Sequence, residues 1–369
     1  MIRNVARDFA QNELLPGVIE RDKHAIYPKE QVAKMQEMGF LGMMTSTDYG
    51  GGGMDTLSYV LVMEEISKVD ASCGVIISVN NSLVCWGLET YGTEQQKEKY
   101  LRPLASGKML GAFCLSEPEA GSDASHQNTT AVDMGDHYLL NGVKNWITNG
   151  KYADIYIIIA QTHPDKGHRG INAFIVEANT KGVSTGEKED KMGIRSSDTC
   201  TVLLDNVKIP KENRIGEDGA GFKFAMSTLN GGRIGIAAQA LGIASGAYER
   251  ALAYSKERET FGKPISHHQD VAFKLADMAT ELEASRLLVY QAAQDKDAGK
   301  SYDISSSMAK LYAAETAMKI TTEAVQIHGG YGYVREYHVE RMMRDAKITQ
   351  IYEGTSEIQK IIIGRSILK

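Results

Sequence analysis

The amino-acid sequence predicts a multidomain α+β protein in which an N-terminal helical domain, a middle β-barrel or β-sandwich domain and a C-terminal helical bundle follow one another. Its 369 residues exceed what a single hydrophobic core usually fills, so several domains or layers are expected. Near residue 109 the apolar residues change from helical spacing to short β-rich runs, and long helical patterns return near residue 218. These changes place the domains at 1–108, 109–217 and 218–369.

The first domain is expected to be helical because its apolar residues recur at mixed three- and four-residue spacing. The segments QVAKMQEMGFLGMM and SYVLVMEEISKV show this pattern, and DYGGGG at 48–53 interrupts it. The opening MIRNVARDFAQNELLP lacks the layout of a signal peptide and is typical of the body of an amphipathic helix. We therefore expect the start of the chain to be shortened.

The middle domain is expected to be a β-barrel or β-sandwich because no long helical pattern separates its β-rich runs. The runs are KMLGAFCL, HYLLNGVKNWIT, DIYIIIAQ, INAFIVEA and DTCTVLLDNVKIP. In the last domain, two stripes at helical spacing are expected to face helix partners. They are Val271, Leu275, Met278, Leu282 and Ser285, and Ile304, Met308, Leu311, Tyr312, Glu315 and Met318.

Composition excludes several classes of function. A hydrophobic content of 43% and a charged content of 24% are typical of a soluble globular protein. The net charge of -6, with scattered Lys and Arg, gives no basic surface for nucleic acid. The sequence is expected to contain no membrane span, because no apolar run approaches the necessary length of about 20 residues. The four cysteines lie far apart without ligand spacing, so reduced thiols and no metal site are expected.

The stretch IYEGTSEIQ at 351–359 places a carboxylate, Glu353, on a glycine-containing loop ahead of a helix start. SEIQ has the form of a capping box with Ser356 as N-cap and Gln359 reaching back, so a helix is expected to begin near Glu357. Free N–H groups at such a terminus can bind an anion. From spacing alone, Glu353 is either a catalytic group or an ordinary surface carboxylate.

Other stretches leave two readings open. The glycine-rich YGGGG, GEDGAG and HGGYGY do not form a Rossmann fingerprint or a P-loop. LSEPEAGSDAS at 115–125 is either a donor loop for a polar ligand or a solvated turn. Trp146 is either a core residue or a stacking wall. Arg233 and Arg258 either bind phosphate or form ordinary surface pairs.

Taken together, these strings resemble the acyl-CoA dehydrogenase family. LSEPEAGSDAS, NGVKNWITNG, GIRSSDT, LNGGRIGIAAQALGIA, RETFGKPI, QIHGGYGYVREYHVERMMRDAKI and IYEGTSEIQ occur in the family's order and at its separations. The resemblance covers residues 1–369 and is strongest to the short-chain (butyryl-CoA) branch. It implies the same three domains, ending in a four-helix bundle, with FAD between them and usually a homotetramer.

The resemblance implies that Glu353 is the base that removes the α-proton of an acyl thioester while a hydride leaves the β-carbon for flavin N5. The backbone N–H of Glu353 and a flavin ribityl hydroxyl are the family's donors to the thioester carbonyl. In the isovaleryl and long-chain branches the base lies instead on the LNGGR helix, where this chain has Gly232. The base implied here is therefore Glu353.

The same resemblance implies the binding residues. FAD contacts are expected from Phe113, Leu115, Ser116, Trp146, Ile147, Thr148, Arg258, Phe261, Gln269, Gln326, Gly329, Gly330, Thr355, Ser356 and Glu357. Gln326, Gly329 and Gly330 are expected to come from a neighbouring subunit. Acyl-CoA contacts are expected from Ser122, Asn230, Arg233 and Gly354. Asn230 departs from the Asp of many short-chain members.

The implied activity is FAD-dependent α,β-dehydrogenation of a short acyl-CoA to the trans-2-enoyl-CoA in fatty-acid β-oxidation, with electrons passing to an electron-transferring flavoprotein. The alternatives are a short branched-chain acyl-CoA dehydrogenase of amino-acid catabolism, an oxidase that uses oxygen, and a non-catalytic acyl-CoA-binding protein. The implied compartment is the cytoplasm of a bacterium, or the mitochondrial matrix of a eukaryote with the presequence absent.

Overall fold

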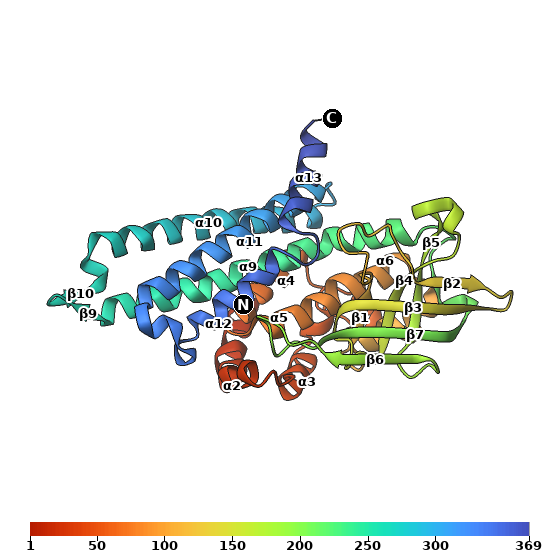
Figure 1. The fold of residues 1–369 in the computed structure, drawn as a ribbon, viewed down its shortest axis with the longest axis horizontal. Helices are drawn as coiled ribbons and strands as arrows, with labels where there is room; N and C mark the ends of the chain where they lie inside the picture. Colours follow the sequence, from red (N-terminus) through yellow and green to blue (C-terminus); the bar gives the residue numbers. More distant parts are fainter. Residues whose placement is uncertain (369) are drawn as a thin grey trace.

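The computed structural model of the protein describes residues 1–368, and its helices and strands follow one another in three blocks (Figure 1). The β-sheet lies at one end of the long axis, and the small hairpin β9–β10 lies at the other (Figure 1). The long helix α9 runs between these two ends (Figure 1). The fold class predicted from the sequence is therefore confirmed.

The first block is helical, and aspartates cap two of its core helices. The Asp55 side chain accepts the N–H of Ser58 at 2.7 Å, and the Asp70 side chain accepts the N–H of Ser72 at 3.0 Å. Such caps satisfy N–H groups that have no partner inside a helix. The α-helices are α1 (Ile2–Phe9), α2 (Val18–Lys23), α3 (Lys29–Glu37), α4 (Thr56–Ser67), α5 (Ala71–Ser78), α6 (Trp86–Tyr91), α7 (Glu94–Gln96) and α8 (Arg102–Ala105). The π-helical segments are η1 (Ala10–Leu14), η4 (Val79–Cys85) and η5 (Lys97–Leu101).

The elements α5, η4 and α6 form one continuous helix, Ala71–Tyr91, of 21 residues. By length and composition alone it is apolar enough to cross a membrane, so the expectation that the chain contains no such run was wrong. Of its most apolar stretch, 94% is buried inside the protein. Its composition is accounted for by its position as a core helix.

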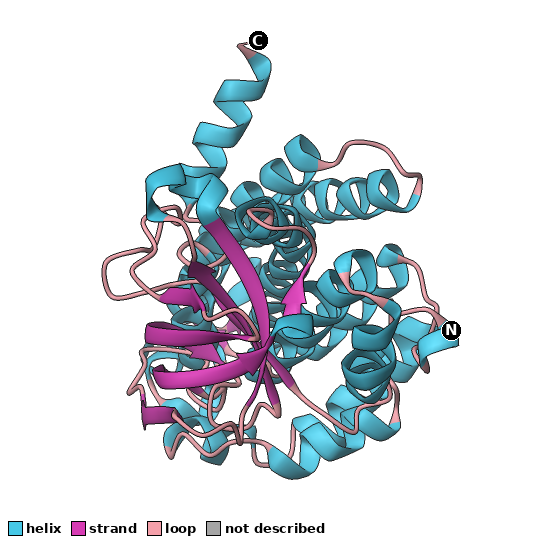
Figure 2. Ribbon diagram, turned by 90° about the vertical axis from the view of Figure 1, so that its right-hand side faces the viewer, coloured by secondary structure: helices cyan, strands magenta, loops and turns pink. Residues whose placement is uncertain are grey.

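The middle block is an eight-stranded sheet, magenta in Figure 2, in the order β6-β7-β3-β2-β4-β5-β8, with β1 paired to β4. A single residue pair, Thr130 with Gln161, joins β2 to β4, so the sheet divides into two arms. The arms share one apolar core, in which the rings of Tyr138 and Phe174 lie 5.0 Å apart. Of the two predicted alternatives, a β-sandwich fits the strands of residues 1–368 better than a closed β-barrel.

The five predicted β-rich runs correspond to strands, and three short strands were not predicted. The predicted strands are β1 (Gly111–Cys114), β3 (His137–Thr148), β4 (Ile155–Gln161), β5 (Ile171–Glu177) and β7 (Thr199–Pro210). The others are β2 (Thr130–Asp133), β6 (Val183–Lys188) and β8 (Arg214–Ile215). Their sequences are too short, or in β6 too polar, to give a strand pattern, and they acquire strand structure by pairing with longer neighbours.

The last block is a four-helix bundle whose fourth helix is short. The bundle consists of α9 (Gly221–Glu257), α10 (Gln269–Asp297), α11 (Asp303–His328) and α12 (Val339–Thr349). The hairpin strands β9 (Glu259–Thr260) and β10 (Lys263–Pro264) connect α9 to α10, and α13 (Ser356–Ile367) projects from the bundle (Figure 1).

One of the two predicted stripes packs inward. On α10, Leu275, Met278, Leu282 and Ser285 are buried, as predicted. On α11 the prediction was wrong for Met308 and Tyr312, which are exposed, whereas Ile304, Leu311 and Met318 are half-buried. In the first half of α11 the buried face consists instead of small residues and one lysine, among them Ser306, Ala309, Lys310, Ala313 and Ala317. Small side chains allow α11 to pack closely against α9, and the larger apolar residues lie outside this contact.

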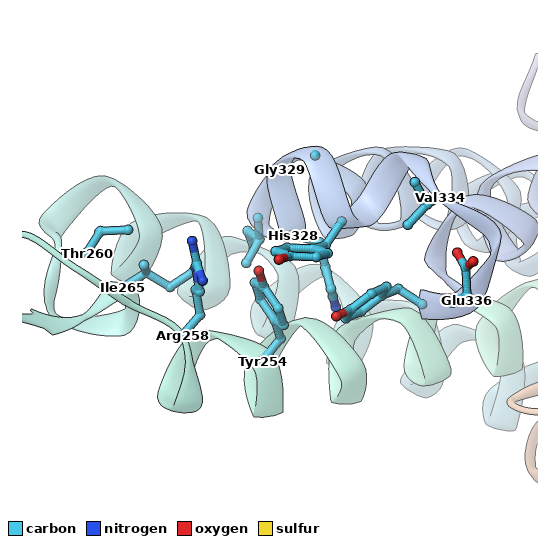
Figure 3. Close-up of a pocket in the computed structure, with 12 residues that line it drawn as sticks. Tyr254, Arg258, Thr260, Ile265, His328, Gly329, Val334 and Glu336 are labelled. Carbon is cyan, nitrogen blue, oxygen red and sulfur yellow. The ribbon is translucent and has the colours of Figure 1, made fainter.

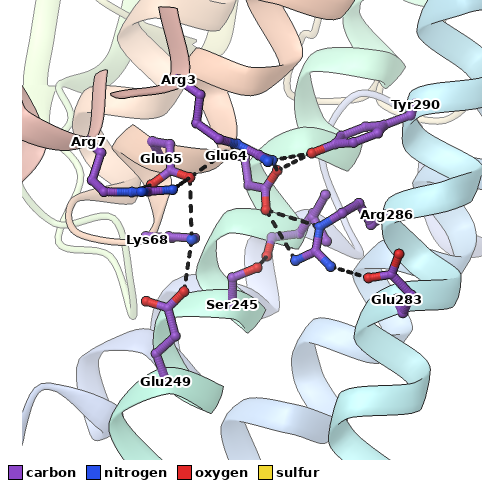
Figure 4. Close-up of polar contacts among 11 residues, drawn as sticks. Arg3, Arg7, Glu64, Glu65, Lys68, Ser245, Glu249, Glu283, Arg286 and Tyr290 are labelled. Carbon is purple, nitrogen blue, oxygen red and sulfur yellow. Dashed lines mark hydrogen bonds and ion pairs between the residues drawn. The ribbon is translucent and has the colours of Figure 1, made fainter. Parts of the chain in front are cut away.

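The N-terminal helices and the bundle share one apolar core, and a charged network joins them (Figure 4). Glu64 of α4 is 1% exposed and accepts hydrogen bonds from Tyr290 at 2.7 Å and from Arg286, both on α10. It also accepts one from Arg3 of α1. This buried carboxylate therefore has partners on both sides of the interface.

Candidate active site

Glu353 lies in the loop between α12 and α13, with its carboxylate turned into the protein. Its Oε2 is inaccessible to solvent and has no hydrogen-bond partner among the described residues. Burial raises the pKa of Glu353 to about 7, although the positive charges of Lys310 and Arg233 act in the opposite direction. A buried, unpartnered carboxylate of this kind can accept a proton near neutral pH.

The backbone of this loop is in a conformation that residues other than glycine rarely adopt. Glu353 has φ +52° and Gly354 has φ +93°. Positive φ at Glu353 costs free energy, and such strain is found where the surrounding structure fixes a functional residue. Lys310 Nζ donates to the Gly354 carbonyl at 2.7 Å, and Gln359 Nε2 donates to the same oxygen at 2.9 Å.

The start of α13 differs from the predicted capping box. Thr355, and not Ser356, is the N-cap, and its side chain accepts the N–H of Ile358 at 3.3 Å. Ser356 instead donates to Glu315 at 2.6 Å. Gln359 reaches back to the loop carbonyls rather than to an N-cap N–H. Thr355 and Ser356 both carry a hydroxyl group at the start of α13, so the sequence pattern allowed either residue as the N-cap.

Two side chains expected to contact acyl-CoA lie on the face of α9 that approaches Glu353. Arg233 is 5% exposed, and its Nη1 donates to Asn230 Oδ1 at 2.5 Å. Asn230 donates in turn to Asp303 at the start of α11. Gly232 lies between them and against the Glu353 carboxylate. Ser122 is exposed on the loop after β1, and no described contact joins it to Glu353.

The residues expected to line the flavin come from two strands that the structure brings together. The N–H of Asn145 on β3 donates to the carbonyl of Ser116, which follows β1, at 2.9 Å. Around this contact, Phe113, Leu115 and Ile147 are buried, and Ser116 and Thr148 are half-buried. Trp146 is 62% exposed at φ +62°, so it is not a core residue.

The helix segment η4 lies between this wall and the carboxylate. A side chain on Gly232 would meet Leu83 of η4 at 2.8 Å as well as Glu353. A side chain on Gly111 of β1 would meet the next residue of η4, Val84. The carboxylate and the β-domain wall are therefore both packed around the same turn of the core helix.

A second set of expected flavin residues lies at the far end of the bundle (Figure 3). Arg258, Gly329 and Gly330 line a hollow of about 830 Å³. In Figure 3, Tyr254 and Arg258 rise from α9 towards His328 and Gly329 at the end of α11. The Arg258 guanidinium lies 5.7 Å from the Tyr331 ring centroid.

The remaining members of this set lie at the same end or beside the first site. Phe261, in the β9–β10 hairpin, is 96% exposed. Gln269 and Gln326 are exposed near the start of α10 and the end of α11. Thr355, Ser356 and Glu357 lie instead at the start of α13 beside Glu353. One chain therefore divides the expected flavin residues between two places.

The distance between these places follows from the geometry of α9. Arg233 and Arg258 are separated by about 25 residues, and an α-helix rises 1.5 Å per residue, so they lie roughly 38 Å apart.

No group of three or more His, Cys, Asp or Glu side chains within residues 1–368 has the arrangement of a metal site. All four cysteines are buried and unpaired.

The sequence analysis did not identify Lys310, nor the hydrogen bond from the Gln359 side chain to the Gly354 carbonyl. Lys310 is completely buried, although it has a charged side chain. The signal available in the sequence was its position on a helix face otherwise made of Ser306, Ala309, Ala313 and Ala317. A lysine on such a face requires an acceptor inside the protein.

Comparison with protein families gives three matches that cover most of the chain. The N-terminal domain of acyl-CoA dehydrogenase matches residues 1–108, and the middle domain matches residues 112–207. The C-terminal domain of acyl-CoA dehydrogenase matches residues 219–368.

Individual relatives are similar over their full length. A short-chain-specific acyl-CoA dehydrogenase of Clostridium acetobutylicum is 51% identical over 100% of this chain and 97% of its own. The CarC subunit of the caffeyl-CoA reductase-Etf complex of Acetobacterium woodii is 49% identical over 100% and 98%. The structure of butyryl-CoA dehydrogenase from Megasphaera elsdenii superposes with a TM-score of 0.98 at 51% identity, covering 100% of this chain and 97% of that one.

Proposed function

The chain belongs to the acyl-CoA dehydrogenase family, and from this relationship we propose that it oxidises a short-chain acyl-CoA to the trans-2-enoyl-CoA. It is a flavin-dependent oxidoreductase that acts on a CH–CH group. The observation that carries the proposal is the buried carboxylate of Glu353, whose Oε2 has no hydrogen-bond partner among residues 1–368 and whose pKa is raised to about 7.

Glu353 acts as the base that removes the proton from the carbon next to the thioester. Its unpartnered Oε2 accepts this proton. Because the pKa of Glu353 is about 7, a large fraction of the carboxyl group is ionised at neutral pH, and the carboxylate is a stronger base than an ordinary glutamate. Bound flavin supplies the acceptor for the hydride from the β-carbon. The Glu353 N–H donates no hydrogen bond to the described backbone, so it is available to the thioester carbonyl.

The cofactor is proposed to be FAD, held at both of the places described above. Trp146, Ser116 and Thr148 fit a flavin ring, because the indole is exposed and neither hydroxyl donates within the described residues. Arg258 and the glycines at 329 and 330 fit a pyrophosphate, because the guanidinium and the bare backbone face one hollow. Thr355 and the first N–H groups of α13 also suit an anion.

The region around Glu353 and the Arg258 end of the bundle lie roughly 38 Å apart in one chain, which supports a flavin site shared between two chains. We propose that the Arg258 end of one chain holds the FAD whose ring lies beside Glu353 of another copy. The enzyme would then be a homo-oligomer, and the family tetramer is the proposed assembly.

The electron acceptor is proposed to be an electron-transferring flavoprotein. A 49% identical relative is named as a subunit of an Etf complex, which supports such a partner. A straight C4 to C6 chain is the proposed substrate, and short branched acyl-CoAs are the second candidate because Asn230 stands where many short-chain members have Asp.

The test is an anaerobic visible spectrum of the purified protein before and after addition of butyryl-CoA. Bleaching of the oxidised flavin with formation of crotonyl-CoA is expected. Glu353→Gln should retain the flavin spectrum, and its rate of bleaching should fall by a factor of about 10³ or more, because an amide cannot accept the proton. Bleaching only by a branched acyl-CoA would support the second candidate, and near-normal turnover of the variant would remove Glu353 from the mechanism.

A further inference from the structure

Lys310 is the one charged residue on the packed face of α11, and it has no part in the mechanism described above. It is completely buried, and its only hydrogen bond within the described residues is the one from Nζ to the Gly354 carbonyl. An ammonium group has three N–H donors, so two remain uncommitted. Burying a cation in this way costs stability and requires a reason.

The position of the Gly354 carbonyl supplies one reason. This carbonyl belongs to the Gly354–Thr355 peptide, one peptide beyond Glu353, in a loop with positive φ at both Glu353 and Gly354. Lys310 from α11 and Gln359 from α13 donate to the same oxygen, at 2.7 and 2.9 Å. Two buried donors from different helices therefore hold the orientation of this peptide.

The charge of Lys310 supplies a second reason. Among charged groups, Glu353 has the largest electrostatic effect on Lys310, yet within the described residues the two side chains form no ion pair within 4.0 Å. At this separation the lysine favours the ionised carboxylate without occupying the oxygen that must accept a proton. A direct ion pair would stabilise the carboxylate more strongly and would block it.

We propose that Lys310 is a positioning residue of the reaction: its Nζ fixes the Gly354 peptide, and its charge keeps the nearby Glu353 carboxylate ionised before substrate arrives. This inference rests on the proposed function. Burial lowers the pKa of Lys310 to about 8, so the lysine remains largely protonated at neutral pH. The other ionisable groups that act on these two residues are Arg233 of α9, Tyr59 of α4, Tyr352 of the loop, Glu315 of α11 and Glu357 of α13.

Lys310→Met and Gln359→Met form a matched pair that separates the two parts of the proposal. Each variant removes one donor to the same carbonyl with an unbranched apolar side chain, and only Lys310→Met also removes a charge. In Lys310→Met the acid limb of the kcat/KM profile should move upward by about one pH unit, which gives a pH-dependent loss of about fivefold at pH 7 that disappears above about pH 9. The lost hydrogen bond should add a loss of kcat that does not depend on pH. In Gln359→Met kcat should fall without movement of the limb.

A direct readout of Glu353 tests the inference independently of turnover. The carboxyl C=O band of Glu353, isolated by infrared difference against Glu353→Gln, should persist to higher pH in Lys310→Met than in the otherwise unchanged protein. Lys310→Arg, which keeps the charge, should restore both the band and the limb. If wild-type protein oxidises no acyl-CoA, the proposed function fails, and the infrared titration still decides the effect of Lys310.

A purely structural part for Lys310 predicts a different result. Flavin content and melting temperature would then fall in Lys310→Met, while the limb and the infrared titration would stay at the wild-type pH. An equal shift in Lys310→Met and Gln359→Met would also overturn the proposal, because the shift would then follow the lost hydrogen bond and not the lost charge.

Discussion

Gly232 of α9 lies directly against the carboxylate of Glu353, and a Cβ atom at this position would overlap Oε2. The neighbouring Gly231 differs, since its nearest outside atom would be Lys296 Nζ at 3.7 Å. Two adjacent glycines on one helix therefore have different environments. Only Gly232 leaves room for the Glu353 carboxylate.

Gly232→Ala is expected to lower kcat/KM by about 100-fold, because the added methyl group displaces the Glu353 carboxylate and a displacement near 1 Å has an effect of this size. Gly231→Ala is the matched control and should stay within a few-fold of wild type. It should also stabilise α9 slightly, since alanine favours a helix over glycine. Steady-state kinetics with butyryl-CoA and the flavin content of both variants provide the measurement. Equal losses in the two variants would contradict the specific contact.

The raised pKa of Glu353 has a consequence for stability. Between the ordinary pKa of a glutamate and about 7, the folded protein binds a proton that the unfolded chain does not, so stability falls as pH rises through this window. Glu353→Gln cannot ionise and should melt at a higher temperature than wild type at pH 8, with the difference vanishing near pH 4.5. Scanning calorimetry across this range checks the sign. A difference that is independent of pH would show that burial does not shift this carboxyl.

Two inactive variants should complement each other if the flavin site is shared between subunits. Glu353→Gln lacks the proposed base, and Arg258→Ala lacks the proposed pyrophosphate contact about 38 Å away in the same chain. A mixed pair contains one site with both defects and one site with neither. Co-expression should therefore restore part of the activity that each variant loses alone. Absence of restoration in verified mixed oligomers would place both residues in one chain's site.

The network in Figure 4 should contribute measurably to stability because its central carboxylate is buried. Glu64→Ala leaves Arg3 and Arg286 without their shared partner and should lower the free energy of unfolding by about 3 kcal/mol. Glu283, whose side chain is 59% exposed, also pairs with Arg286 and serves as the control. Its replacement by alanine should change stability by less than about 1 kcal/mol. Denaturant titration of both variants checks the difference.

The sequence predicted those elements whose own residues determine their structure. The run IYIIIA contains enough β-branched residues to form β4 wherever it lies, and Glu353 belongs to a motif distinctive enough to identify. The strand β6, with the sequence VSTGEK, was not predictable in the same way, because its structure depends on pairing with β7. The buried face of α11 was also missed, since alanine and serine carry little hydrophobic signal.

The site shows the same division between local and non-local information. The loop carbonyl that Lys310 holds is 44 residues away in the chain, so no spacing rule connects the two. The choice between Thr355 and Ser356 as N-cap depends on Glu315, which binds the Ser356 hydroxyl from another helix. The sequence allowed Trp146 to be either a core residue or a stacking wall, because its positive φ, which turns the indole outward, is a property of the folded strand.

The shared core described for α9 and the N-terminal helices affects the order in which the chain can fold during synthesis. Gly242 and Gly246 of α9 lie against the backbone of Glu64 and Lys68, and the apolar helix Ala71–Tyr91 is covered by the same layer. When only the first two domains have emerged from the ribosome, the face of this helix that packs against α9 is therefore still uncovered. Until residues 221–257 emerge, this nascent chain presents a surface that chaperones bind, and a pause in translation at that stage would favour aggregation.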